Sequence, residues 1–411
     1  MRLFFRSPYS QTATYPNAKQ VSLTTYRDAD GQTSAVKASK ATELNVPGLP
    51  KNARHALIDA IPLASLHVHL GGTVSPELLF QVAERNKLLP LIGEAQKEYH
   101  SAGDLRKDYA FQGLNHFLKF YHLGTEAFRT EQDFYELTFD YLKSCKKQNI
   151  PYVEIFFDPQ SYPHAPLETQ IEGFQRACTD AKKQLGITTK PILTFVRHDG
   201  FSPDKAVASA MALLDALEAL EKKRPGTIKQ FVAVGLGGIE DGYPPALFKP
   251  VYQRAKTLGI QHATAHAGEV LNSEDIWNAI NELGLERINH GQNAIHEEKL
   301  MRYLSETKIP LTLCPISNLL LNNVTSLENH PLRPMLDRGL VVSVHDCDPA
   351  FFNEKTVKDN LHAIAEAQDL SPKEIVQLAR NSFLSAFMPD TEKQQYLADV
   401  DRLAKQFHAS A

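Results

Sequence analysis

From about residue 61 onward, short apolar segments alternate with longer amphipathic segments, and this alternation constrains the fold more than any other feature of the chain. Short apolar runs indicate buried strands, whereas apolar residues at helical spacing indicate helices packed on a sheet. Repeated units of strand and helix predict a parallel α/β sheet. Eight such units favour a closed (β/α)8 TIM barrel over an open doubly wound sheet. The candidate strands cover residues 63–69, 152–157, 192–196, 231–235, 262–266, 287–289, 311–314 and 341–345.

Two regions fall outside this alternation. Residues 1–55 are rich in Ser, Thr, Gln and Lys without sustained periodicity, which predicts an N-terminal extension ahead of a barrel domain over residues 56–411. The segment from about 75 to 150 is too long for one crossover, so we expect extra helices there, over the barrel mouth. Their aromatic residues are typical of core packing, and a lid role for a few of them stays open. Further helices are expected at the C-terminus, near 354–367, 372–387 and 391–407.

The composition excludes several classes of partner. With 44 Lys and Arg against 48 Asp and Glu, the formal net charge is -4. The chain therefore has no net positive charge that would attract nucleic acid or an anionic membrane. No apolar run approaches the ~20 residues of a spanning helix. The four cysteines are far apart and form no CxxC pair, which indicates reduced thiols and predicts a cytoplasmic protein. The sequence leaves the oligomeric state open, with a homo-oligomer among the alternatives.

Three histidines at predicted strand ends indicate a metal site. His67 and His69 are separated by one residue, so on a strand they point to the same face. An isolated pair of this kind is as often a structural feature as a pair of ligands. His266 ends the fifth predicted strand and supplies a third imidazole at the matching end of the barrel. Three histidines with an open fourth position are typical of catalytic Zn²⁺, which lowers the pKa of water toward neutrality.

Two further polar residues follow predicted strand ends. Glu269 lies three residues after His266 in a Gly-containing turn, where a carboxyl group can exchange a proton with a substrate beside the metal. The alternative is a carboxylate that only favours a helix dipole. His290 ends the sixth strand and predicts an imidazole that orients the attacking hydroxide, or otherwise a buried histidine bonded to a backbone carbonyl.

Several short motifs resemble the adenosine and adenine deaminase family of the amidohydrolase superfamily. The resemblance extends over nearly everything from Pro62 to about Phe387, and the segments at 129–142 and 153–160 are closer to the adenine deaminase branch. It implies Zn²⁺ bound by the three histidines, general acid/base work by Glu269 and orientation of hydroxide by His290. The reaction it implies replaces a purine ring amine with a carbonyl. The motifs are LHVHLGG at 66–72, HAGE at 266–269, NHG at 289–291, CPISN at 314–318 and DCDPAFF at 346–352.

One departure from this family pattern lies in the metal site. The eighth strand of relatives ends with two aspartates before Pro, whereas this chain has Cys347 and Asp348 before Pro349. Asp348 resembles the family's second aspartate, which contacts the substrate. A thiolate is a good but softer zinc ligand, so Cys347 is a candidate fourth ligand. An inert buried thiol and a shifted Asp346 are the alternatives.

Two other departures replace acidic residues with glycine. Gly71 stands where relatives carry an acidic residue after HxHL, which predicts a roomier substrate site at this position. Gly237 stands where relatives usually show an aspartate, and Gly238 follows it. Adjacent glycines let the backbone approach a flat ligand closely. We therefore expect Gly71, Gly238 and Asp348 to contribute to substrate binding.

The leading hypothesis is a zinc-dependent aminohydrolase that deaminates a purine-like N-heterocycle, such as adenine, adenosine or a modified relative. A first alternative is hydrolytic removal of an alkylamino group from a modified purine by the same site. A second, from a different class, is a binding protein that keeps the deaminase fold without turnover, as the substitutions at Cys347, Gly71 and Gly237 would allow.

Overall fold

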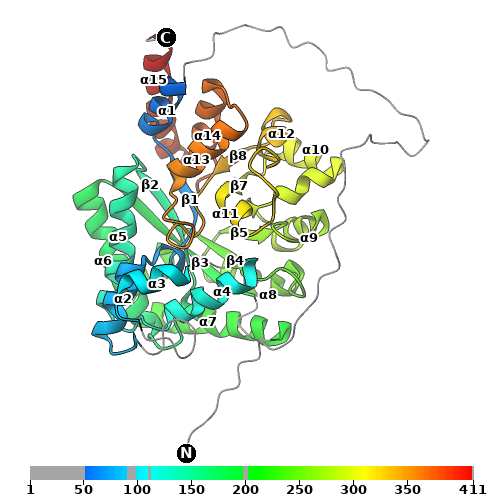
Figure 1. Ribbon diagram of the computed structural model, residues 1–411. Helices are drawn as coiled ribbons and strands as arrows, with labels where there is room; N and C mark the ends of the chain where they lie inside the picture. The colour runs from blue at the N-terminus through cyan, green and yellow to red at the C-terminus, as the bar shows by residue number, and fades with distance from the viewer. Residues whose placement is uncertain (1–50, 90–98, 110–112, 198–201, 410–411) are drawn as a thin grey trace, which may run out of the picture. The chain divides into compact units, whose positions relative to one another are not determined.

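The computed structural model describes residues 51–89, 99–109, 113–197 and 202–409. Its eight strands form one sheet in which each strand pairs in parallel with the next along the chain (Figure 1). A strand order that follows the chain order requires a helical crossover after each strand, as the alternating pattern predicts. The strands are β1 (Ala64–His69), β2 (Tyr152–Phe157), β3 (Thr188–Val196), β4 (Ala233–Gly237), β5 (His262–Ala267), β6 (Arg287–His290), β7 (Leu311–Leu313) and β8 (Val342–Val344).

The sheet closes where the chain beyond β8 returns to β1. Val68 and Cys347 form a parallel bridge. The Cys347 amide donates to the His67 carbonyl oxygen and the His69 amide donates to the Cys347 carbonyl oxygen, each at 2.9 Å. Hydrogen bonds across this last seam leave no open edge, which confirms the expected (β/α)8 barrel. The seam also places Cys347 beside the histidines of β1.

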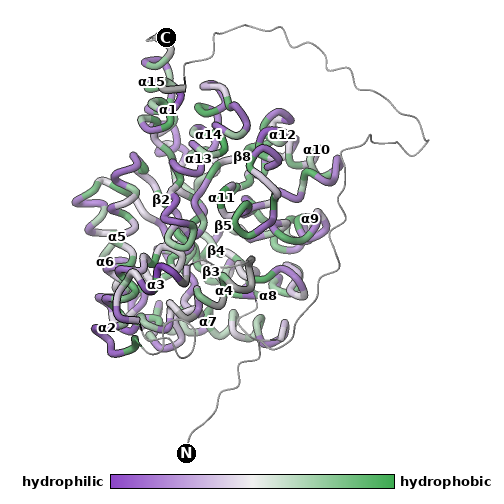
Figure 2. The backbone as a smooth tube through the Cα atoms, viewed as in Figure 1, coloured by the Kyte–Doolittle hydropathy of each residue, from purple (hydrophilic) through white to green (hydrophobic). Residues whose placement is uncertain are grey.

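Helices follow the strands around the outside of the barrel. In Figure 2 most of these helices carry both purple and green turns, as expected of helices with one buried side. Local signals fix several ends: Asn272 caps α9 through the Glu274 amide, and Gly284 ends it with φ 65°. The crossover helices are α6 (Leu167–Leu185), α7 (Pro203–Lys223), α8 (Lys249–Thr257), α9 (Ser273–Leu283), α10 (Glu298–Thr307), α11 (Pro315–Leu320) and α12 (Leu332–Asp337).

The described parts of the long insertion between β1 and β2 are mainly helical, as predicted. It contains the 3-10 helix η1 (Gly71–Thr73) and the helices α2 (Pro76–Arg85), α3 (Ala102–Asp108), α4 (Gly113–Thr125) and α5 (Glu131–Lys147). Phe128, Phe134 and Tyr141 join the main core, which agrees with the expectation for the aromatic residues. Phe117, Phe120 and Tyr121 on α4 instead pack in a smaller cluster with Cys314, Cys347, Phe351 and Phe352. A few aromatic residues of α4 therefore cover the barrel mouth.

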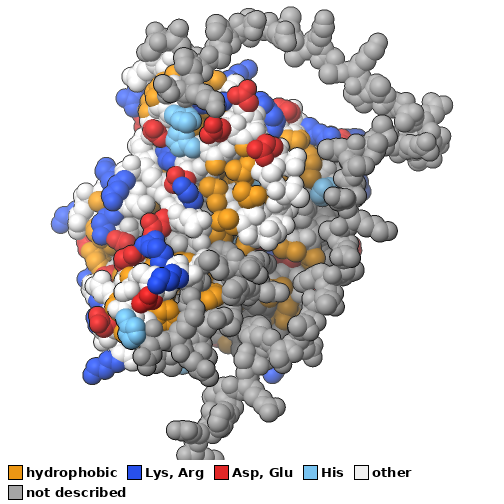
Figure 3. All heavy atoms as spheres, viewed as in Figure 1, with side chains coloured by type: hydrophobic (Ala, Val, Ile, Leu, Met, Phe, Trp, Pro, Cys, Tyr) orange, Lys and Arg blue, Asp and Glu red, His pale blue; other side chains and the backbone are white. Residues whose placement is uncertain are grey.

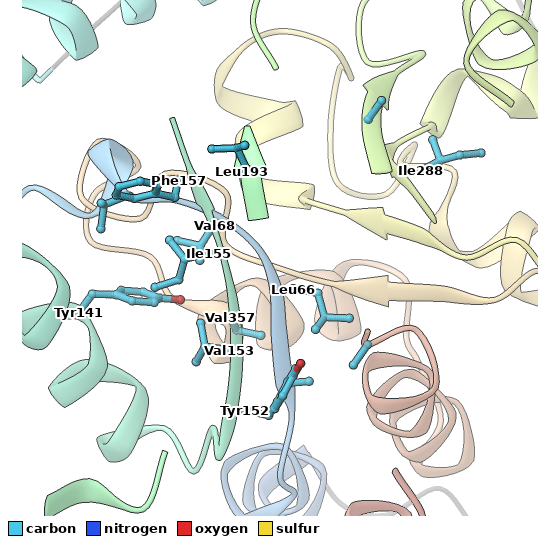
Figure 4. Packing of buried hydrophobic residues seen from close by; sticks show 14 of the residues in the cluster. Leu66, Val68, Tyr141, Tyr152, Val153, Ile155, Phe157, Leu193, Ile288 and Val357 are labelled. Atoms are coloured by element: carbon cyan, nitrogen blue, oxygen red, sulfur yellow. The ribbon is translucent and has the colours of Figure 1, made fainter. Parts of the chain in front are cut away.

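The main core lies between the barrel wall and the outer helices. Alternate residues of β1 and β2 point outward, and Figure 4 shows Leu66, Val68, Val153, Ile155 and Phe157 among the buried side chains of this layer. Because side chains of a strand alternate between faces, the residues between these, including His67, point into the barrel. Packing of the outer layer thus fixes which way the histidines face.

The ends of the described chain are helical. The expected C-terminal helices are present as α13 (Val357–Ala367), α14 (Pro372–Leu384) and α15 (Asp390–Ala409). Helix α1 (Lys51–Ala60) spans the expected boundary at residue 55, and residues 1–50 lie outside the described residues, so the extension over residues 1–55 stays a prediction. Among the described helices, none has the length and apolarity that a membrane span needs. Figure 3 shows acidic and basic side chains interspersed over the described part of one face.

Candidate active site

Three histidines converge inside the barrel at the C-terminal ends of its strands. His67 and His69 come from β1, and His266 comes from β5 on the opposite wall. The Nε2 atom of His266 lies 3.2 Å from Nε2 of His67 and 3.0 Å from Nε2 of His69. Two nitrogens that each lie ~2.05 Å from a tetrahedral zinc are roughly 3.3 Å apart. The spacing therefore fits three imidazoles around one small cation.

In two of these histidines, the hydrogen bond made by Nδ1 determines which ring nitrogen carries the proton. Nδ1 of His266 lies 2.9 Å from the Leu236 carbonyl oxygen, and Nδ1 of His67 lies 2.9 Å from the Thr312 hydroxyl oxygen and 3.2 Å from the Thr312 carbonyl oxygen. The Thr312 hydroxyl donates to the Asn289 side-chain oxygen at 3.3 Å, so it accepts from His67. A carbonyl oxygen only accepts, so each Nδ1 carries the proton and each Nε2 presents a lone pair. Two lone pairs facing each other at 3.2 Å repel unless a cation lies between them.

Burial keeps the imidazoles neutral, as ligands must be. Removal from water lowers the pKa of His69 and of His290 to about 3, and it lowers the pKa of His67 and of His266 well below the ordinary value. Neighbouring histidines contribute further to the shift of the His67 pKa, because a second positive charge in the same cavity is unfavourable. Neutral imidazole is the form that binds a metal.

Cys347 adds a sulfur to the same cluster. Its Sγ lies 3.9 Å from Nε2 of His67, and the ligand atoms of His67, His69 and Cys347 all lie within 4.8 Å of one another. Cys314 forms a second such group with His67 and His290. Asp346, the alternative ligand, instead accepts hydrogen bonds from Ser65 and Tyr141 at 3.4 and 3.1 Å. The geometry thus favours the thiol over the shifted carboxylate.

Glu269 sits beside the metal cluster as a neutral acid. Burial, together with the neighbouring carboxylates of Glu240 and Asp348, raises the pKa of Glu269 to about 8. Its Oε2 lies 3.5 Å from Nε2 of His290, and its Oε1 accepts a hydrogen bond from Asn323 at 3.2 Å. A carboxyl group that keeps its proton at neutral pH can donate it to a substrate.

A pocket opens beside these residues. It is lined by His69, His266, Glu269 and His290 together with Cys347 and Asp348, and by apolar residues of α4 such as Phe117 and Leu118. Gly238 also lines it, whereas Gly71 does not. Burial raises the pKa of Asp348 to about 8, and its Oδ2 accepts a hydrogen bond from the Cys347 thiol at 3.1 Å.

The two glycine substitutions have different consequences. A Cβ atom at Gly71 would lie 2.4 Å from the Tyr121 ring, so the expected extra room at this position is taken by an aromatic side chain from α4. A Cβ atom at Gly237 would meet only ordinary contacts, at 3.6 Å to Thr194, 3.7 Å to His69 and 3.8 Å to His266. The extra room predicted at Gly71 is therefore absent, whereas Gly237 leaves the backbone accessible beside the metal histidines.

Comparison with known proteins identifies the family. The adenosine deaminase family model matches residues 62–403. The chain belongs to the adenosine deaminase family. An adenine deaminase of Ectopseudomonas mendocina is 41% identical over 327 residues, covering 79% of this chain and 97% of that protein. An adenine deaminase of Acinetobacter baylyi is 37% identical over 350 residues, covering 84% and 98%. The crystal structure of adenine deaminase from Arthrobacter aurescens aligns with a TM-score of 0.76 and 34% identity over 84% of this chain and 100% of that chain.

This membership makes the chain a metal-dependent hydrolytic deaminase of purine substrates within the amidohydrolase superfamily. It confirms the TIM-barrel fold, the enzyme class and the reaction type expected from the motifs. The candidate histidine and cysteine ligands are the residues of this deaminase that could hold its metal.

Sequence reasoning missed several residues that shape this deaminase's pocket. Glu240 accepts hydrogen bonds from the amides of residues 269, 270 and 271 at 2.8–3.0 Å, and so holds the turn that carries Glu269. It lies two residues after Gly238, and its burial in the fold is what the sequence did not reveal. Tyr121 and Asp158 join across the pocket wall at 3.0 Å from distant parts of the chain, and no local pattern marks either one.

Proposed function

We propose that this deaminase removes the exocyclic amine of a 6-aminopurine by hydrolysis, with the free base as its preferred substrate. The supporting observation is the pair of facing Nε2 lone pairs of His67 and His266 next to a carboxyl group that retains its proton. The facing lone pairs favour a bound cation, and the protonated carboxyl group of Glu269 can donate its proton to a purine ring nitrogen. The curated relatives at 37% and 41% identity act, by their names, on adenine.

Zn²⁺ is the proposed metal, held by His67, His69, His266 and Cys347. When bound it would lower the pKa of water toward neutrality and so supply the attacking hydroxide. Three nitrogens and one sulfur suit zinc better than magnesium or calcium, which prefer oxygen ligands. The neutral imidazoles, spaced about 3 Å apart at their Nε2 atoms, support this assignment.

Each remaining site residue has a proposed task. Glu269 gives its proton to a purine ring nitrogen as the adjacent carbon is attacked. The resulting carboxylate then takes the proton of the added hydroxyl group and passes it to the amine, so that the C–N bond breaks as the carbonyl forms. His290, 3.5 Å from Glu269, orients the attacking water. Asp348 accepts or donates a hydrogen bond at the imidazole edge of the base, and the backbone at Gly238 approaches the ring. Gly71 contributes indirectly, because it admits the Tyr121 ring.

The lining of the pocket favours a base over a nucleotide. Among the described residues that line it, neither Lys nor Arg is present. A phosphate group brought into such a pocket would leave water without a Lys or Arg side chain to pair with its charge. Phe117, Leu118 and Leu321 instead offer apolar contact to a planar ring.

The decisive assay measures ammonia release by the zinc-loaded full chain from adenine, adenosine and AMP. We expect the highest kcat/KM for adenine and the lowest for AMP. Glu269→Gln should lower it about 10²–10⁴-fold while metal content stays the same. Glu274→Gln is the matched control, because Glu274 is exposed at the start of α9. Absence of turnover on every purine, with zinc bound, would refute the proposal in favour of the binding-protein alternative.

A second candidate function is removal of an alkylamino group from an N6-substituted purine. Gly237 lines the pocket next to His69 and His266, and this is where we place the departing nitrogen and any substituent on it. Gly237→Ala adds a methyl group there without a steric clash. If N6-methyladenine is a substrate, this variant should lower its kcat/KM relative to that of adenine by roughly tenfold.

The extension over residues 1–55, a cytoplasmic location and assembly into a homo-oligomer stay predictions. The cysteines, unpaired in the described residues, are compatible with a reducing compartment.

A further inference from the structure

The turn that carries Glu269 is held by side chains that the proposed chemistry does not use. Residues 268–271 lie between β5 and α9. The side chains of this turn add little packing of their own, because Val270 is 48% exposed and Leu271 is only partly buried. The position of the turn therefore depends on hydrogen bonds to its peptide groups.

Glu240 binds the amide groups of this turn from the segment that follows β4. Its Oε1 accepts from the Glu269 amide at 3.0 Å, and its Oε2 accepts from the Val270 and Leu271 amides at 2.9 and 2.8 Å. The Glu240 side chain is buried, and hydrogen bonds to a carboxylate are stronger than those between neutral groups. Both oxygens take part, so the whole carboxylate is engaged by three consecutive amides.

Two residues that follow β6 bind the carbonyl groups of the same turn. The Gln292 side chain donates to the Glu269 carbonyl oxygen at 2.8 Å. The Asn293 side chain donates to the carbonyl oxygens of Glu269 and Leu271 at 3.3 and 2.7 Å. The backbone of Glu269 is thus bonded on both edges, by Glu240 at its amide and by Gln292 and Asn293 at its carbonyl.

Arg197 ties this arrangement to the metal histidines. Its fully buried guanidinium donates to the His266 carbonyl oxygen and, at 3.4 Å, to the Tyr243 carbonyl oxygen. The Tyr243 amide in turn donates to the Glu240 carbonyl oxygen at 3.0 Å. Arg197 therefore connects the backbone of His266 to the segment that carries Glu240, and this keeps the candidate ligand and the acid in a fixed relation.

We propose that Glu240 is a positioning residue of the deaminase, which holds the Glu269 carboxyl group in place through the three amides so that its proton reaches the substrate ring nitrogen. This inference rests on the proposed role of Glu269 as the acid. A displacement of about 1 Å near a reacting group can lower the rate roughly 10²-fold. Glu240 is not among the described residues that line the pocket, so its replacement should leave substrate binding nearly unchanged.

The test compares Glu240→Gln with the wild type, both as the zinc-loaded full chain. The substitution keeps the side-chain volume but replaces one acceptor oxygen with an NH2 group that faces backbone N–H donors. We expect kcat for adenine to fall about 10–100-fold, with KM within about twofold and metal content unchanged. Hydrogen–deuterium exchange at the amides of residues 269–271 should become faster, and this measurement needs no turnover.

Glu221→Gln is the matched control at the opposite end of the barrel. Glu221 accepts from the Gly226 and Ile228 amides at 2.7 Å each, in the connection between α7 and β4. This variant should speed exchange at residues 226–228 and keep the kcat of the wild type. Asn293→Ala is a second test variant, because it loosens the 268–271 turn from its other edge at a partly buried position. Its kcat should also fall while KM is retained.

Three results for Glu240→Gln would each overturn the positioning role and leave the proposed function intact. These are an unchanged kcat, unchanged exchange at residues 269–271, and a raised KM at constant kcat. A wild-type protein that binds zinc but converts no purine would refute the proposed function and this inference with it. Should Glu240→Gln fail to fold, a wild-type kcat in Asn293→Ala would overturn the inference, and a lowered kcat with retained KM would support it.

Discussion

His290 and Cys347 adopt left-handed backbone conformations, with φ 63° and 64°, at the points where the chain leaves the barrel after β6 and β8. Such conformations are unfavourable for residues other than glycine by roughly 1–3 kcal/mol, and they persist where surrounding contacts hold them. At Cys347 those contacts are backbone hydrogen bonds to both His67 and His69. The sharp turn after each strand carries a polar side chain into the pocket, so the strain serves the site.

Cys347→Asp tests whether the thiol limits the reaction. Aspartate tolerates a positive φ, and its carboxylate is a harder metal ligand than a thiolate and a better hydrogen-bond partner for hydroxide. We expect zinc content to stay the same and kcat for adenine to rise about tenfold. In Co²⁺-substituted protein, the sulfur-to-metal charge-transfer absorption of the wild type should disappear. An unchanged kcat with the metal still bound would instead indicate a change in substrate choice.

The pH dependence of kcat/KM should follow the protonation state of Glu269. Its pKa is raised to about 8 from the usual 4.5, so the donating acid form is present at neutral pH and is lost as the pH rises through about 8. We expect kcat/KM to fall about tenfold per pH unit above that point. A Glu269→Gln variant should lose this alkaline limb along with most of its activity. An identical limb in the variant would assign the titration to another group.

At the scale of elements, helix α4 and the turn η1 form a matched pair. Gly71 in η1 is covered by Tyr121 from α4, whose hydroxyl donates to Asp158 at 3.0 Å. The absence of a side chain at Gly71 is thus what allows an aromatic ring to close this part of the barrel mouth. The Tyr121 side chain of the neighbouring helix α4 thus occupies the space that a side chain at residue 71 would need.

Gly71→Ala should therefore displace α4. A Cβ atom 2.4 Å from the Tyr121 ring forces the ring to move, and overpacking of this kind typically destabilises by about 1–3 kcal/mol. Urea unfolding should show this loss, and KM for adenine should rise. Gly103→Ala on α3 is the control, because its Cβ would meet only Ser101 at 3.5 Å. Equal behaviour of the two variants would contradict the account of Tyr121.

At the scale of the whole barrel, a buried ion pair closes the end opposite the site. Arg287 at the start of β6 donates to Glu154 of β2 at 2.7 Å and to the Ser385 carbonyl oxygen at 3.0 Å. Glu154 also accepts from the Phe387 amide at 2.6 Å. The pair joins two opposite strands to the segment after α14, so it links barrel closure to the C-terminal helices.

Removing one partner of the Glu154–Arg287 ion pair should lower the free energy of unfolding more than replacing both partners with apolar residues. Glu154→Ala leaves the fully buried Arg287 without its anion, which is expected to lower the free energy of unfolding by about 3–5 kcal/mol. The double variant Glu154→Leu, Arg287→Met removes both charges and should recover much of that loss. Urea denaturation of the wild type and both variants checks this. A double variant less stable than Glu154→Ala would contradict the explanation.

The expected strands and the observed ones agree where local pattern decides the element. The spacing of His67 and His69 placed both imidazoles on one face, and the predicted segment 152–157 matches β2. The fourth strand was predicted at 231–235 but runs over Ala233–Gly237, because Phe231 and Val232 belong to the turn that follows the 3-10 helix Ile228–Gln230. Glycines at 235 and 237 resemble a turn, although here they let the strand approach Thr194 and the histidines.

The sequence by itself determined the alternation of strands and helices, the face on which each strand histidine lies, and the reaction class carried by its motifs. These depend on local periodicity and on side-chain chemistry, and both can be read from residues that are close together in the sequence. Only the tertiary structure decided that Tyr121 fills the space at Gly71 and that Glu240 holds the Glu269 turn. Those contacts join residues far apart in the chain, and barrel closure alone brings them within reach.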